Sequence, residues 1–280
     1  MKREFRLCVA DIDRTLRMKG EGLPDLNREA FKALHEKGVL LGLASGRPLW
    51  QGVEKTYIEW GLGFQFDLLI GLNGAEIYDV NKNERTRLNY LDTDTTKFII
   101  ETMKPFGCFP FIYREEYMLA AGINGRILKS LSRNSGELKI ADDISELWSE
   151  PTAKVLYGTD TPEELVPLQS EGEKLAEKNI SCFKTDIDLL ELQSSLNNKG
   201  AALEYYCLNN NIDLQDVIAF GDAENDIEMM EKAGYSVCLC NGMDRAKTVA
   251  LQRSSGNRYQ NQKVLKISLK MRFIFHFTYK

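Results

Sequence analysis

Histidine is scarce in this sequence, because only His35 and His276 occur among 280 residues. Enzymes of the Ser-His-Asp or Cys-His type need a histidine that accepts the proton of their nucleophile. His35 falls in the middle of a predicted helix and His276 in the C-terminal tail, so we expect neither in a catalytic centre. Any catalysis must therefore depend on carboxylates and lysine.

Several targeting and binding signals are also missing. The six cysteines form no CxxC pair and have no histidines at zinc spacing, so we expect them to be reduced and packed mostly as small apolar groups. No apolar run approaches the length that crosses a bilayer, and the chain starts with a strand pattern instead of a signal peptide. The formal net charge of −5 gives no reason to expect a nucleic-acid partner. These absences predict a cytoplasmic protein with no membrane partner, and they leave its oligomeric state open.

The beginning and the end of the chain alternate between strand and helix patterns. This alternation implies parallel strands joined by right-handed crossovers, hence an α/β fold with a doubly wound, Rossmann-like parallel sheet. In such sheets, ligands bind at the carboxyl ends of the strands. The predicted strands are 6–10, 39–43, 66–71, 75–79, 216–220 and 235–239, of which 66–71 and 75–79 form a hairpin. The predicted helices are 26–37, 48–60, 199–208 and one that ends at 232.

The middle of the chain has a different character. Strand-like segments alternate with helical ones there, and no segment ends in a group of polar residues; these strands are 109–113, 117–121, 154–157 and 188–192. We therefore predict a discontinuous core domain of residues 1–81 and 193–280, with a second α/β domain inserted over residues 82–192.

The first motif that carries chemistry is Asp11-x-Asp13-x-Thr15, directly after a buried strand. Two carboxylates this close together in a loop can divide one task, in which one attacks and the other moves protons. An aspartate nucleophile can take up a phosphoryl group and so split a difficult hydrolysis into two easier steps. Alone, the motif is equally compatible with a solvated acidic turn.

Two further motifs carry groups that suit a phosphate. Ser45-Gly46-Arg47 follows a predicted strand and opens a helix, where a hydroxyl and backbone N–H groups can cradle an anion. A serine in this place is also an ordinary helix N-cap. Lys199 stands at the start of another helix, where lysine is usually exposed. If it pointed inward, it would offset the repulsion between Asp11 and a phosphate.

The fourth motif is Gly221-Asp222-x-x-Asn225-Asp226, again after a buried strand. Asp222 can bind a hard cation through oxygen, and Asp226 can do so directly or through water. Asn225 can donate hydrogen bonds to a phosphate or to the nearby carboxylates. Clustered carboxylates repel one another, so a cation is needed to keep them ionised. Together the four motifs therefore predict a Mg²⁺ site, with Asp222 and Asp226 as its candidate ligands.

These motifs, in this order, resemble the haloacid dehalogenase superfamily, and within it the Cof-type branch of sugar-phosphate phosphatases. The resemblance extends to about residue 250 and includes Leu43 to Pro48, Asn73-Gly74-Ala75 and Asn198-Lys199-Gly200. It implies that Asp11 is the nucleophile and a metal ligand. It also implies that Asp13 is the general acid and base and binds the metal through its backbone carbonyl.

The resemblance assigns the other residues to binding. Ser45 and Lys199 would hold the phosphate, Asp222 would bind Mg²⁺ and Asn225 would lie beside the phosphate. Gly46 belongs to the same phosphate loop, and Arg47 is a candidate contact for the leaving group. The inserted segment, residues 82–192, would be the cap domain that closes over the site and selects the substrate.

The sequence departs from the family pattern in two places. Arg14 stands where the family usually has glycine, which puts the local backbone geometry and charge in question. Beyond about residue 250 the family's closing strand and helix are not recognisable. Residues 245–280 contain nine Lys or Arg and no Asp or Glu, and we expect a final strand or an ordinary terminus there instead of a membrane contact.

We therefore predict a Mg²⁺-dependent phosphatase that acts on a small phosphorylated metabolite, such as a sugar phosphate. Two other functions are compatible with the same fold. One is a phosphotransferase or mutase that passes the phosphoryl group to a sugar hydroxyl instead of water. The other is a non-catalytic phosphate-binding protein. The presence of Asp11, Asp13, Lys199 and Asp222 together argues against the last.

Overall fold

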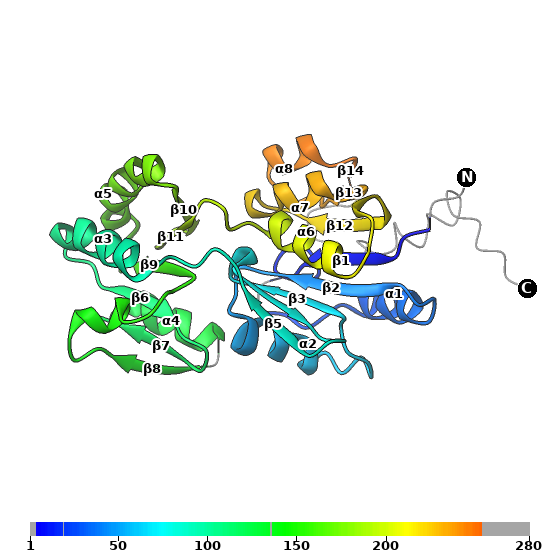
Figure 1. Ribbon diagram of the computed structural model, residues 1–280, viewed down its shortest axis with the longest axis horizontal. Coiled ribbons are helices and arrows are strands. Elements are labelled where there is room, and N and C mark those ends of the chain that lie inside the picture. The colour runs from blue at the N-terminus through cyan, green and yellow to red at the C-terminus, as the bar shows by residue number, and fades with distance from the viewer. Residues whose placement is uncertain (1–3, 19, 135, 254–280) are drawn as a thin grey trace, which may run out of the picture. The chain divides into compact units, whose positions relative to one another are not determined.

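The structure, a computed structural model, describes residues 4–18, 20–134 and 136–253. The described residues form two compact units (Figure 1). The first unit consists of those within 4–46, 53–86 and 198–253, and the second of those within 47–52 and 87–197.

An eight-stranded sheet forms the centre of the first unit, in the order β14-β13-β12-β1-β2-β3-β4-β5. The strands from β14 to β3 are parallel to their neighbours, and β4 pairs antiparallel with β3. The strands are β1 (Leu7–Asp11), β2 (Leu40–Ala44), β3 (Leu68–Gly71), β4 (Glu76–Asp79), β5 (Glu84–Arg87), β12 (Val217–Gly221), β13 (Tyr235–Cys238) and β14 (Gln252–Arg253).

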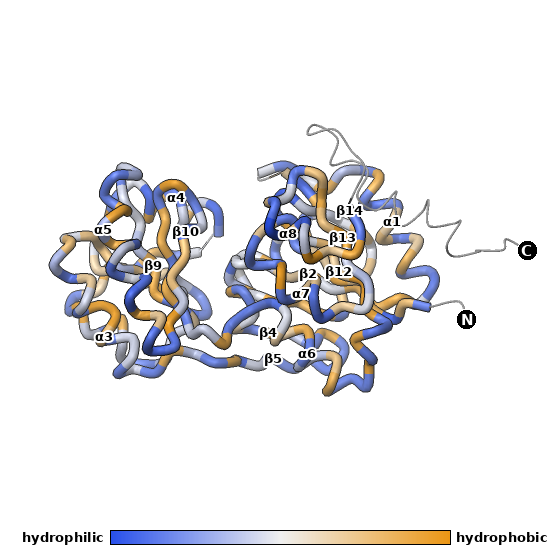
Figure 2. The backbone as a smooth tube through the Cα atoms, turned by 90° about the horizontal axis from the view of Figure 1, so that it is seen from above, coloured by the Kyte–Doolittle hydropathy of each residue, from blue (hydrophilic) through white to orange (hydrophobic). Residues whose placement is uncertain are grey.

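Helices cover both faces of this sheet. Figure 1 shows α1 and α2 on one side and α6 on the other, as right-handed crossovers require. Every residue of the central strands β1 and β12 is buried, which explains their nearly continuous apolar sequences. In Figure 2 the backbone tube has the colour of hydrophobic residues along much of β12 and β13. The helices are α1 (Asp25–His35), α2 (Lys55–Glu59), α6 (Lys199–Asn209), α7 (Ile227–Lys232) and α8 (Asp244–Val249).

The chain reverses its direction across the sheet between β1 and β12. From β1 the chain continues to β2 and β3 on one side, while β12 and β13 lie on the other. Asp11 pairs in register with Ala44, and Ala10 pairs with Phe220. The loops after β1, β2 and β12 therefore begin at one level, at the kind of switch point where open α/β sheets bind ligands.

A six-stranded, mostly antiparallel sheet forms the second unit, in the order β10-β11-β9-β6-β7-β8. Helices α3 and α5 contribute to a core on one face, and α4 contributes to a smaller core on the other. Val155 and Leu156 of β9 belong to different cores, as alternation along a strand requires. The elements are α3 (Thr93–Met103), β6 (Pro110–Tyr113), β7 (Tyr117–Ala120), α4 (Gly125–Asn134), β8 (Glu137–Ile140), β9 (Lys154–Gly158), α5 (Pro162–Glu173), β10 (Ile180–Asp186) and β11 (Leu189–Ser194).

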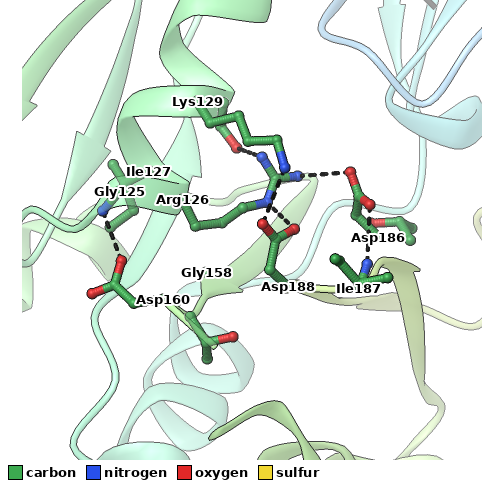
Figure 3. A network of polar contacts seen from close by, with 12 residues as sticks. Gly125, Arg126, Ile127, Lys129, Gly158, Asp160, Asp186, Ile187 and Asp188 are labelled. Atoms are coloured by element: carbon green, nitrogen blue, oxygen red, sulfur yellow. Dashed lines mark hydrogen bonds and ion pairs between the residues drawn. The ribbon is translucent and has the colours of Figure 1, made fainter. Parts of the chain in front are cut away.

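A buried arginine ties α4 to the turn between β10 and β11. Arg126, which is 3% exposed, places its Nε 2.8 Å from Oδ1 of Asp188 and its Nη2 3.8 Å from Oδ2 of Asp186 (Figure 3). The exposed Lys129 reaches the same Asp188, at 3.1 Å. Gly158 makes room for the arginine, because a Cβ there would lie 2.7 Å from Cγ of Arg126. This network adds polar contacts to the packing of Ile127, through which α4 joins the smaller core.

The structure differs from the sequence-based elements in a few places. Strands β5, β8 and β10 were not predicted. The predicted helix over 48–60 is a π-helical segment, Leu49–Glu54, followed by the short α2. A final strand or an ordinary terminus was expected within residues 245–280; of this stretch the structure describes 245–253, which ends in β14, and the rest lies outside the described residues. Within the described ranges, no helix is long and apolar enough to span a bilayer.

Candidate active site

A fully buried lysine joins two of the predicted loops. Nζ of Lys199 lies 2.6 Å from Oδ1 of Asp11 and 2.6 Å from Oδ1 of Asp226. Lys199 is the first residue of α6, where the Asn198 side chain caps the helix by accepting from the Ala201 N–H at 2.7 Å. The lysine therefore enters the site from a fixed helix start, and it faces the carboxylate at the end of β1.

The residue after Lys199 explains how α6 comes so close to the loop after β12. A Cβ on Gly200 would lie 2.5 Å from the carbonyl carbon and oxygen of Glu228 in α7. Glycine thus allows the first turn of α6 to pack directly against the backbone of α7. The glycine next to the lysine serves helix packing, and it is not part of a phosphate-binding P-loop.

The loop after β12 is organised around the carboxylate of Asp226. Its Oδ2 accepts hydrogen bonds from the backbone N–H groups of Asp222 and Ala223, at 2.9 and 3.0 Å. Gly221 lies so close to this carboxylate that a Cβ would meet Cγ of Asp226 at 2.8 Å. Oδ1 of Asp222 accepts a hydrogen bond from Oγ1 of Thr15 at 2.6 Å. The loops after β1 and β12 are thereby bonded to each other.

Burial and mutual repulsion disfavour the charged form of these carboxylates. Burial raises the pKa of Asp11 well above its usual range; Lys199 opposes the rise, and Asp226 and Asp222 add to it. Burial and the neighbouring Asp226 raise the pKa of Asp222 to about 7, although the Thr15 hydrogen bond lowers it. Burial also lowers the pKa of Lys199, but Asp11 and Asp226 more than offset this, so the net pKa is raised and the amine is charged.

The three carboxylates fit a divalent cation. Asp11, Asp222 and Asp226 are all buried, and each offers an oxygen within 4.8 Å of the others. Oxygen-only ligands of this kind suit Mg²⁺. Burial is the main reason why the pKa values of Asp11 and Asp222 are raised, and repulsion from the neighbouring acids adds to it; the single charge of Lys199 faces three carboxylates. A bound cation would supply the missing positive charge.

The predicted phosphate loop follows β2. Ser45, which is 3% exposed, donates its backbone N–H to the carbonyl of Ile70 at 2.9 Å. Its own carbonyl accepts from the backbone N–H of Asn73 at 3.0 Å. Asn225 donates from Nδ2 to Oδ1 of Asn73 at 3.1 Å. The loops that carry Ser45 and Asn225 therefore meet at Asn73.

Asp13 and Arg14 lie at the edge of the cluster. The Asp13 carboxylate is 3.8 Å from Nε of Arg17 and is partly exposed, and it is not among the three clustered acids. Arg14 has a left-handed backbone, with φ of 70°, and its side chain is exposed. Its carbonyl accepts a hydrogen bond from Nδ2 of Asn241 at 3.0 Å.

Arg47 is the one predicted site residue that clusters with the second unit, in the segment Arg47–Gly52. Within that unit its charge acts on Tyr113 of β6. Burial raises the pKa of the Tyr113 phenol and Glu191 adds to the rise, whereas Arg126 and Arg47 oppose it. The other predicted residues all belong to the first unit.

Two residues of this site were not assigned a role from the sequence. Thr15 was part of the first motif, and its hydroxyl donates a hydrogen bond directly to Asp222. Asn73 was named only within the stretch Asn73-Gly74-Ala75 of the family resemblance, without a role, although it contacts two of the predicted loops. Both stand in the loop that follows a strand of the parallel sheet, and both belong to stretches that carried the family resemblance; these are the signals that point to them.

Comparison with known proteins identifies the family. The haloacid dehalogenase-like hydrolase family matches residues 8–258, so the chain belongs to this family. An HMP-PP phosphatase of Escherichia coli O6:H1 is 26% identical over 243 residues, which cover 86% of each chain. The 5-amino-6-(5-phospho-D-ribitylamino)uracil phosphatase YwtE of Bacillus subtilis is 24% identical over 273 residues, covering 86% of this chain and 90% of its own.

A solved structure supports the fold assignment. The haloacid dehalogenase-like hydrolase from Bacteroides thetaiotaomicron superposes with a TM-score of 0.83 at 24% identity, over 95% of this chain and all of its own. The predicted α/β fold class is thus confirmed. The predicted family is confirmed as well, and so is the enzyme class, a phosphoric monoester hydrolase.

Proposed function

We propose that this protein is a Mg²⁺-dependent phosphatase that hydrolyses a small phosphorylated metabolite through a phosphoryl group carried on Asp11. The observation that carries the proposal is the buried Lys199, held at 2.6 Å from both Asp11 and Asp226. A buried amine with two carboxylate partners is fixed in place and stays charged, so it can stabilise a phosphate beside Asp11.

In the first step, an oxygen of Asp11 attacks the phosphorus atom, and the bond from phosphorus to the leaving oxygen breaks. Asp13 donates its proton to that oxygen, so that the leaving group departs as an alcohol. Lys199 compensates the negative charge that builds up on the phosphoryl oxygens. Ser45, Gly46 and Asn225 donate hydrogen bonds to the same oxygens, and Arg47 contacts the leaving group.

In the second step, Asp13 takes a proton from water, and the water oxygen attacks the phosphorus atom. The bond from phosphorus to Asp11 breaks, which releases inorganic phosphate and restores the carboxylate. Asp11, Asp222 and the Asp13 backbone carbonyl would hold Mg²⁺, with Asp226 in contact through water because its oxygens already accept three hydrogen bonds. When bound, Mg²⁺ neutralises the carboxylates and the phosphate.

We further propose that the protein acts in the cytoplasm and that the segment 82–192 is a cap domain that selects the substrate. The polar residues of the second unit, including Arg47 and Tyr113, are candidates for this selection. A screen of phosphorylated metabolites against the purified protein would identify the substrate, with release of inorganic phosphate as the readout.

Replacing the proposed nucleophile tests the mechanism. We expect Asp11→Asn to lower the release of phosphate from p-nitrophenyl phosphate by more than about 1000-fold, because an amide cannot form the intermediate. Asp25→Asn is the control, since Asp25 is exposed at the start of α1 in the same unit. Full activity of Asp11→Asn would reject the nucleophile.

Metal removal and labelled water test the remaining claims. EDTA should abolish the activity and added Mg²⁺ should restore it; activity that survives EDTA would reject the metal. In oxygen-18 water, the released phosphate should contain one labelled oxygen per turnover. A product that carries the phosphoryl group on an added sugar would identify a phosphotransferase instead.

A further inference from the structure

The turn between β3 and β4 has an unusual backbone. Three consecutive residues have positive φ angles: Leu72 at 49°, Asn73 at 58° and Gly74 at 105°. For residues with a Cβ, a left-handed conformation costs about 1–2 kcal/mol each. Leu72 and Asn73 are also buried, at 2% and 3% exposure. Such strain persists only where the surroundings hold it, and it is frequent at functional sites.

The contacts of Asn73 show what the strained turn holds. Its backbone N–H donates to the carbonyl of Ser45, and its side-chain Oδ1 accepts from Nδ2 of Asn225. The same Oδ1 would lie 2.9 Å from a Cβ on Gly46, so the phosphate loop packs directly on the Asn73 amide. One side chain thus touches both the loop after β2 and the loop after β12.

The next residue extends the contact to the lysine. A Cβ on Gly74 would lie 2.2 Å from the carbonyl oxygen of Asn198 and 3.2 Å from the backbone nitrogen of Lys199. Only glycine permits this approach and its positive φ at once. The turn therefore abuts the peptide that starts α6 and carries Lys199 into the site.

We propose that Asn73 is a positioning residue for phosphate binding and acts through Asn225. This inference rests on the proposed function of the site. Because Oδ1 of Asn73 can only accept, it fixes which end of the Asn225 amide faces it. One N–H of Asn225 bonds to Asn73, and the second N–H is then directed to a phosphate oxygen. Without Asn73 the Asn225 amide can rotate, and this donor is no longer pre-oriented.

A double-mutant cycle separates this role from a purely structural one. The deletion variant is Asn73→Gly, because glycine adopts a φ of 58° without strain and removes only the side chain. We expect Asn73→Gly to lower kcat/KM for p-nitrophenyl phosphate by roughly 10- to 100-fold. In the Asn225→Ala background the same change should cost less than about 2-fold, because the group it positions is gone.

Two further variants complete the design. Asn83→Gly is the matched control, because Asn83 also has a left-handed φ, of 53°, and lies exposed in another turn of the same unit. It should keep wild-type kinetics. Asn73→Asp retains an acceptor oxygen at the same position. In the Asn73→Asp background, Asn225→Ala should therefore still lower kcat/KM by the same factor as in the wild type. This arm tests the inference even if Asn73→Gly does not fold.

The inference is overturned if Asn73→Gly lowers kcat/KM by the same factor in the wild-type and Asn225→Ala backgrounds, or if it leaves kcat/KM of the wild type unchanged. Failure of the proposed function gives a different result, because the wild-type protein would then release no phosphate from any substrate. In that case the affinity for inorganic phosphate, measured by calorimetry in the same four proteins of the cycle, still tests the coupling. Equal losses of affinity in both backgrounds would overturn it.

Discussion

Arg14 occupies a backbone conformation in which glycine is the unstrained residue. Its φ is 70°, and the backbone is held there at both ends: its N–H donates to the carbonyl of Arg17 at 2.6 Å, and its carbonyl accepts from Asn241. Glycine, which the family resemblance led us to expect at this position, would adopt this conformation without strain. Arginine at this position therefore strains the backbone, but the loop still forms both of these hydrogen bonds.

Replacing Arg14 with glycine should stabilise the protein. Relief of the left-handed strain contributes about 1–2 kcal/mol, whereas the larger unfolded-state entropy of glycine costs about 0.5–1 kcal/mol. We expect a net gain of about 0.5–1 kcal/mol in the free energy of unfolding, measured by urea denaturation. Arg14→Ala is the control, because it removes the same charge and keeps the strain. Equal shifts in both variants would show that charge, and not the backbone, is responsible.

Lys199 shows why a single motif of the site could not be interpreted in isolation from the other motifs. A lysine at a helix start is ordinarily exposed, and this one is 0% exposed. Its partners Asp11 and Asp226 are 188 and 27 residues away, so no local pattern contains the reason for its burial. The order of the four motifs predicted their meeting, because each motif follows a strand of one parallel sheet or starts a helix beside it.

At the scale of elements, burial decides which strands could be predicted. The runs of β1 and β12 are apolar because both faces of the sheet are covered, and both were predicted within one residue of their observed bounds. β5, with the sequence ERTR, lies at a sheet edge and is largely exposed, and so is β8 at the edge of the other sheet. Backbone hydrogen bonds to the neighbouring strand hold these edge strands. Because their side chains are largely exposed, their sequences carry no hydrophobic pattern that would predict a strand.

The attachment of α4 depends on the charge of Arg126, and no sequence pattern predicted this role. We expect Arg126→Met to lower the free energy of unfolding by about 2 kcal/mol, because it leaves Asp188 without its buried partner. The cost is below that of a fully buried pair, since the Asp188 side chain is 16% exposed and water can reach it. Lys129→Met removes the exposed cation from the same Asp188 and should cost less than about 1 kcal/mol. Urea denaturation of both variants measures the difference; equal costs would contradict a special role for Arg126.

At the scale of the whole molecule, the order of the motifs predicted more than any one of them. The family match over residues 8–258 agrees with a site built from both ends of the chain, with Asp11 near the start and Asp222 near the end. The predicted domain boundaries and the role of residues 82–192 as a cap remain predictions. What the sequence could not supply is the set of contacts within the site, because they join residues that are distant along the chain.

Magnesium should couple the site to the stability of the whole protein. A ligand that binds only the folded state at about 100 times its Kd adds about 2.7 kcal/mol to the free energy of unfolding. We therefore expect Mg²⁺ to raise Tm by roughly 5–10 °C, measured by thermal unfolding against NaCl of equal ionic strength. The cause would be the neutralisation of carboxylates whose pKa burial raises, to about 7 for Asp222.

Asp222→Asn separates specific binding from a general effect of salt. This variant removes a buried carboxylate that repels its neighbours, so without Mg²⁺ it should be more stable than the wild type. It should also lose most of the response to Mg²⁺, because a ligand is gone. Asp25→Asn, which removes an exposed carboxylate of the same unit, should keep the full response. If Asp222→Asn responded to Mg²⁺ as strongly as the wild type, the cation would bind elsewhere, and the buried cluster of Asp11, Asp222 and Asp226 would not be its site.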